Sequence, residues 1–137
     1  MTTVFEVTLV LATLACSLVA GLVFTFAVVV MPGIKKLKDG EFIRAFQVMD
    51  GIIQDNQPLF MLVWVGSAFA LIAATALGMM ELTGTNRILL IAAACIYLFL
   101  VQLPTIVINI PLNNELQTLE VGAMNEDELQ LARTKFE

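Results

Sequence analysis

The sequence contains no histidine among its 137 residues. Without imidazole there is no histidine ligand for haem or zinc, and no histidine base for a Ser-His catalytic pair. A metal site built from carboxylates alone stays open in principle, but no acidic residues are spaced to suggest one. We therefore expect no metal and no cofactor.

Charged residues are also scarce, at 14% of the chain, whereas a soluble domain has about 25%. Hydrophobic residues make up 59%, and the mean hydropathy is +0.91. Most of the surface is therefore too apolar to face water. The net charge of −5 and the lack of a large basic patch predict no nucleic acid partner.

The two cysteines, Cys16 and Cys95, each lie inside an apolar stretch. They form no CxxC pair, so the sequence predicts no disulfide framework. We interpret both as small apolar residues of helices.

Three apolar runs, at residues 7–31, 58–80 and 88–110, are long enough to cross a bilayer. The first is too long for the core of a signal peptide, and no Lys or Arg precedes it. We expect Pro32 and Gly33 to end it. The prediction is an all-α transmembrane helical bundle in a single domain.

Residues 41–56 predict a short amphipathic helix that lies at the membrane interface or folds back on the bundle. Its apolar stripe is Phe42, Phe46, Met49 and Ile53. The opposite side carries its polar residues, among them Asp50 and Asp55, for which a solvated helix face is the simplest interpretation.

Small residues recur every four positions in the second apolar run, at Gly66, Ala70, Ala74 and Gly78. Such a ridge lets another helix approach closely. Two interpretations stay open. The ridge packs on the first run, which has a similar strip at Ala12, Cys16 and Ala20, or it binds a partner in a homo-oligomer or a larger membrane complex.

Positive residues predict the orientation of the chain. Four lie between the first two runs, at Lys35, Lys36, Lys38 and Arg44, whereas the next loop has only Arg87. We expect the first loop and the tail 111–137 in the cytoplasm, the N-terminus outside, and the protein in the cell inner membrane. Asn125, followed by Glu128, predicts the N-cap of a helix from Glu126 onward.

Three segments carry a family resemblance: residues 21–33, residues 42–60 and residues 105–116. The most specific is the last, with Asn109, Pro111 and Asn113 at alternate positions. Together they resemble the anthrone oxygenase-like family of small integral membrane proteins, most of whose bacterial members have no assigned function. The resemblance covers nearly the whole chain.

The resemblance implies a four-helix membrane bundle, whose fourth span is expected after Glu137. It also implies oxidation of anthrones with dioxygen and no obvious cofactor, or binding of an apolar aromatic or quinone-like molecule. Such oxidation needs a base for a substrate proton. The candidate bases here are Asp50, Asp55 and Glu115.

Topology predicts that polar residues of the amphipathic helix face the end of the third span, with Asn56 and Asn114 nearby. The candidate ligand-binding residues are Gln47, Asp50, Gln54, Gln102, Asn109 and Asn113. Alternatively, Asn109 and Asn113 only cap the third span. The alternative function is a non-catalytic accessory subunit of a larger membrane complex. A transporter is disfavoured, because the spans contain no internal charge.

Overall fold

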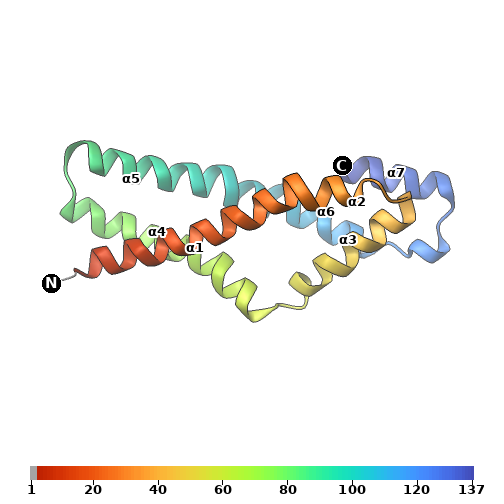
Figure 1. Cartoon of the computed structure of the whole chain (residues 1–137), viewed down its shortest axis with the longest axis horizontal. Coiled ribbons are helices and arrows are strands. Elements are labelled where there is room, and N and C mark those ends of the chain that lie inside the picture. The colour runs from red at the N-terminus through yellow and green to blue at the C-terminus, as the bar shows by residue number, and fades with distance from the viewer. Residues whose placement is uncertain (1–2) are drawn as a thin grey trace. The chain divides into compact units, whose positions relative to one another are not determined.

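The computed structural model describes residues 3–137, and within them every regular element is helical (Figure 1). This confirms the predicted all-α fold class. The α-helices are α1 (Val4–Thr25), α2 (Met31–Ile34), α3 (Asp39–Gln54), α4 (Pro58–Glu81), α5 (Gly84–Tyr97), α6 (Ile110–Gln117) and α7 (Glu126–Phe136).

Three continuous helical stretches are long and apolar enough to cross a membrane: Val4–Ile34, Pro58–Glu81 and Gly84–Gln117. The third contains 34 residues, which at 1.5 Å per residue is about 50 Å. The hydrocarbon core of a bilayer is only ~30 Å thick. This helix is therefore longer than the core requires, and it includes residues that the sequence assigned to a tail starting at Pro111.

Three prolines lie inside these long helices, and each follows a π-helical turn. The turns are Phe26–Val30, Leu98–Gln102 and Thr105–Asn109, and Pro32, Pro104 and Pro111 come two residues after them. In the first turn the Met31 N–H bonds to the Phe26 carbonyl, five residues back. A proline ring clashes with the carbonyl four residues earlier, and a wider turn relieves this crowding. The first helix therefore passes through Pro32 and Gly33, which the sequence predicted as its end, and ends one residue later at Ile34.

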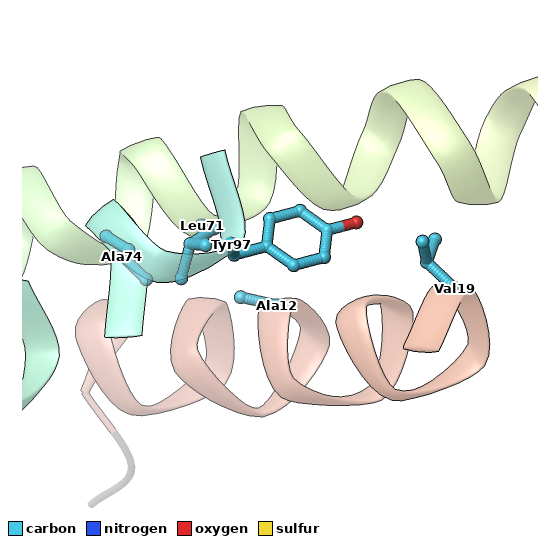
Figure 2. Close-up of a cluster of buried hydrophobic side chains, with 6 residues drawn as sticks. Ala12, Val19, Leu71, Ala74 and Tyr97 are labelled. Carbon is cyan, nitrogen blue, oxygen red and sulfur yellow. The ribbon is translucent and has the colours of Figure 1, made fainter. Parts of the chain in front are cut away.

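The helices form two compact units. The first contains the described residues up to Leu22 together with Pro58–Thr105, and the second contains Val23–Gln57 and Ile106–Glu137. The core of the first unit draws on α1, α4 and α5. In Figure 2 the ring of Tyr97 lies between the ribbons of α1 and α4. The buried residues of this core are Ala12, Val19, Leu71, Ala74, Ala94 and Tyr97.

The small-residue ridge of α4 is used unevenly within this unit. Ala74 and Gly78 are buried. A Cβ atom built on Gly78 would lie 2.4 Å from Leu90 Cδ2 and 3.0 Å from Phe5 Cε2, whereas one on Gly66 would meet nothing within 4 Å. Close packing inside the chain therefore explains the part of the ridge that Ala74 and Gly78 form.

A linker of two residues, Leu82 and Thr83, joins α4 to α5. Gly84 begins α5 with a φ of 56°, a left-handed conformation that glycine adopts without strain. The side chain of Arg87 donates from Nε to the Leu82 carbonyl at 2.8 Å, which satisfies a backbone acceptor just after the end of α4.

The second unit packs α3 against α6 and α7. Its core residues are Phe42, Ile43, Phe46, Leu116 and Leu129. Phe42 and Phe46 are buried as the predicted apolar stripe requires, but Met49 and Ile53 are only partly buried. Asp50 is buried in their place, so its interpretation as part of a solvated face is wrong.

Helix α7 begins at Glu126 with Asn125 as its N-cap, which confirms the prediction for this segment. The Asn125 Oδ1 accepts from the Glu128 N–H at 3.0 Å, and Glu128 accepts in return from the Asn125 N–H at 2.9 Å. This reciprocal capping satisfies two N–H groups at the start of the helix.

Arg133 connects α7 to the segment that precedes α3. Its guanidinium donates to the carbonyls of Lys35 and Leu37 and to Asp39, at 2.7, 2.9 and 2.9 Å. Desolvation opposes its charge, but hydrogen bonds with Asp39 and Glu137 outweigh that effect and raise the pKa of Arg133. The guanidinium therefore stays charged and holds this segment against α7.

Candidate functional site

Asp50 is the centre of the polar side chains in the second unit. It follows Phe42 and Phe46 at intervals of four residues, which places all three on one face of α3. Only 5% of Asp50 is exposed. A carboxylate is rarely buried to this extent unless other groups satisfy it.

Three side-chain amides satisfy this carboxylate. Asn113 Nδ2 donates to Oδ1 at 3.0 Å. Gln117 Nε2 and Gln54 Nε2 donate to Oδ2 at 2.9 and 3.1 Å. Because an ionised carboxylate only accepts, it fixes the orientation of each amide with the NH₂ group towards Asp50.

Helix geometry explains why α6 supplies two of these donors. Asn113 and Gln117 are four residues apart and therefore neighbours on one face. Gln117 also donates to the Gln47 carbonyl at 3.0 Å, and Gln54 donates to Asn114 Oδ1 at 2.8 Å. The α3–α6 contact is thus a connected network of amides around one acid, which we call the Asp50 cluster.

Gln47 has a different role at the edge of this cluster. Its Nε2 donates to the carbonyls of Leu116 and Leu119, at 2.8 and 3.0 Å. Leu116 lies in the last turn of α6 and Leu119 lies two residues after its end. Gln47 therefore fixes the end of α6 and, through it, the position of Gln117.

No ion pair of residues 3–137 uses Asp50. The ion pairs there join Arg133 to Asp39 and Glu137, and Lys135 to Glu115. An ionised carboxylate offers about four acceptor positions, and the three amide donors leave one. That position is on Oδ1, which among the side chains of residues 3–137 accepts only from Asn113. Chemically, the cluster can bind one further hydrogen-bond donor or accept a proton.

Four of the six candidate residues meet in this network: Gln47, Asp50, Gln54 and Asn113. Asn109 does not join them, because it is exposed and its side chain makes no hydrogen bond or helix cap within residues 3–137. Gln102 belongs to the first unit. Gln117 was missed, although its spacing from Asn113 is a signal that could have found it.

Two other candidate bases have ordinary surroundings. Asp55 is exposed at the end of α3, as the solvated-face interpretation had it. Glu115 is exposed and pairs with Lys135. An open groove of about 640 Å³ lies beside Glu115, between α6 and α7. It uses the face of α6 opposite Asn113 and Gln117, so it does not lead to Asp50.

The first unit contains a separate polar group inside the spans. Ser67, Tyr97 and Gln102 are 0%, 8% and 8% exposed. Ser67 Oγ donates to the Trp64 carbonyl at 2.6 Å and lies 2.6 Å from Tyr97 Oη. Because the serine hydrogen is already used, Tyr97 donates to Ser67 and accepts from Gln102 Nε2 at 3.1 Å.

The π-helical turn Leu98–Gln102 makes this group possible. Residues five apart point about 140° away from each other in an α-helix. A π-helical turn closes with bonds over five residues, which brings Tyr97 and Gln102 to the same side. Tyr97 thus has two roles, because its ring belongs to the buried core and its hydroxyl satisfies Gln102.

Comparison with known proteins gives one finding. A family model described as anthrone oxygenase matches residues 57–136, which include α4 to α7 and the α6 side of the Asp50 cluster. No curated protein and no solved structure matches the chain.

Proposed function

Because the chain belongs to the anthrone oxygenase family, we propose that it is a cofactor-free membrane oxygenase in which Asp50 acts as the general base. The proposed substrate is an apolar, fused-ring anthrone or a similar quinone precursor. The Asp50 cluster is the observation that carries this proposal. It combines a buried carboxylate, one unfilled acceptor position and a surround of neutral donors.

The chemistry requires little more than a base and an apolar setting. Oδ1 of Asp50 removes a proton from the ring methylene of the anthrone, and the electron pair spreads into the ring carbonyl as an enolate. Dioxygen then oxidises this carbon, and the resulting hydroperoxide eliminates water to form the quinone. Each anthrone therefore consumes one dioxygen and releases one water. The proton on Asp50 leaves with that water.

The amides have a role in this scheme beyond holding Asp50. Gln54 bridges Asp50 and Asn114, and both amide side chains are exposed. A substrate that arrives from this side meets the NH₂ group of Asn114, which can bind its enolate oxygen. The buried phenyl rings of Phe42 and Phe46 supply the apolar side of the cluster, where hydrogen bonds gain strength from the low dielectric.

We also propose the orientation that the positive residues predict. The N-terminus is outside, and residues 35–57 and the C-terminal segment are on the cytoplasmic side of the inner membrane. This places the Asp50 cluster at the cytoplasmic end of the third long helix, where substrates can partition from the bilayer.

The test is Asp50→Asn in the full chain, reconstituted in lipid nanodiscs and supplied with 1,8-dihydroxyanthrone. Dioxygen uptake and quinone absorbance are measured above the rate of protein-free autoxidation. General bases contribute about 10²–10⁴-fold, so we expect a loss of at least ~100-fold. Asp55→Asn is the matched control, because it removes the same charge from the exposed end of the same helix.

Equal turnover by the Asp50→Asn variant and the wild type would refute the role of Asp50. A wild-type chain without turnover that copurifies in fixed ratio with another membrane protein would favour the accessory subunit instead.

A further inference from the structure

The unpaired positive charges of the chain are concentrated in one short segment. The chain has seven Lys and Arg residues. Arg133 and Lys135 form ion pairs, and Arg87 binds a carbonyl. The other four form no ion pair within residues 3–137, and all four are exposed: Lys35, Lys36, Lys38 and Arg44.

The acidic residues of the same segment offset these cations only in part at the N-terminal end of α3. Asp39 is paired with Arg133, and Asp50 is buried in its amide cluster. Glu41 is exposed but accepts from the Lys38 backbone N–H at the start of α3. Asp55 lies at the far end of the helix. Residues 35–44 therefore hold four cations against two acids, Asp39 and Glu41, which is a formal charge of +2, although the whole chain has a net charge of −5.

The position of these cations along the chain fixes their surroundings. Lys35 directly follows Ile34, the last residue of the first membrane-spanning helix. Helix α3 begins four residues later, and the second spanning helix begins at Pro58, four residues after α3 ends. Residues 35–57 are thus joined at both ends to helices that are long and apolar enough to cross a membrane.

The outer face of α3 has the pattern of a helix that contacts lipid. Arg44, Val48 and Ile52 are spaced by four and form one stripe. Val48 and Ile52 are 67% and 59% exposed, and Leu37 among the lysines is 38% exposed. Exposed apolar side chains beside cations are typical of helices that lie in an anionic membrane surface.

We propose that residues 35–52 bind anionic phospholipid. Lys35, Lys36, Lys38 and Arg44 contact the phosphates, and Val48 and Ile52 enter the acyl boundary. This site is independent of the proposed oxygenase reaction. Each cation near an anionic surface raises lipid affinity about fivefold, so the preference for phosphatidylglycerol over phosphatidylcholine is sensitive to the loss of two charges.

The experiment places a fluorophore on Ile52→Cys in the full chain with Cys16→Ala and Cys95→Ala. Quenching is compared in vesicles that contain acyl-brominated phosphatidylglycerol or phosphatidylcholine. We expect at least fivefold preferential quenching by phosphatidylglycerol. The double variant Lys36→Gln, Lys38→Gln should lose most of this preference. The double variant Arg87→Gln, Lys135→Gln should keep the preference, although it changes the net charge by the same amount.

A salt titration tests the proposal without any change to the four cations. High salt should abolish the preference for phosphatidylglycerol in the labelled chain that keeps Lys35, Lys36, Lys38 and Arg44. Equal quenching by the two lipids, or a label shielded from both by another protein surface, would overturn the proposal. So would displacement of phosphatidylglycerol by inorganic phosphate, which would indicate a site for a free ion.

Discussion

Gly78→Ala is the sharpest test of packing between the spans. A new Cβ would lie 2.4 Å from Leu90 Cδ2 and 3.0 Å from Phe5 Cε2, whereas carbon atoms in contact prefer about 3.5–4.0 Å. The overlap with Leu90 is therefore about 1.1–1.6 Å. Phe5 is 5% exposed, so its ring has little space into which to move.

Gly66→Ala provides the matched control on the same helix, because its new Cβ meets nothing within 4 Å. Both changes gain the same helix propensity, up to ~1 kcal/mol. Only Gly78→Ala adds an overpacking cost, about 1 kcal/mol, at the low end of the usual range because the end of the half-buried Leu90 side chain can shift. The free energy of unfolding in mixed micelles should therefore differ between the two variants by about that amount.

A third variant identifies the contact. In a Leu90→Ala background the difference between Gly78→Ala and Gly66→Ala should shrink, because the nearest overlapping atom is gone. Phe5 remains, so part of the difference should persist. Equal effects of the two glycine substitutions in both backgrounds would refute the close packing of α4 on α1 and α5.

Two further predictions follow from polar contacts. Tyr97→Phe should lower the free energy of unfolding by about 0.6–1.5 kcal/mol. When Tyr97→Phe is combined with Gln102→Leu, the loss of unfolding free energy should be smaller than the sum of the two single losses. Additive losses would contradict the shared hydrogen bond. Arg133→Lys keeps the charge but loses the guanidinium fork, so α7 should exchange amide hydrogens faster than in the Lys135→Arg control; unchanged exchange would exclude the contact with Lys35.

The long helices could be predicted from the sequence because apolar composition and length alone identify a membrane span. Their ends were less predictable. Pro32 and Pro111 normally predict a helix end, but π-helical turns before them let the helices continue. Such turns have no composition signal that distinguishes them from an ordinary turn, so the continuation to Gln117 could not be predicted.

The candidate site was predictable in part. Counting polar residues on α3 and near the end of the third span found Asp50 and Asn113. It placed Phe42 and Phe46 on the buried side of α3 correctly but not Asp50, because the predicted stripe continued to Met49 and Ile53 instead. Phe42 and Val48 are both apolar, yet only Phe42 is buried. The choice depends on the tertiary contact with α6 and α7.

The Asp50 cluster has a consequence for the chemical ageing of the protein. All three donors to Asp50 are side-chain amides, and slow hydrolysis converts an amide into an acid. Deamidation of Asn113 or Gln117 would replace a donor with a second carboxylate about 3 Å from the first, an arrangement that like charges oppose. The time for which the cluster stays chemically intact therefore depends on how well the fold protects these amides from water.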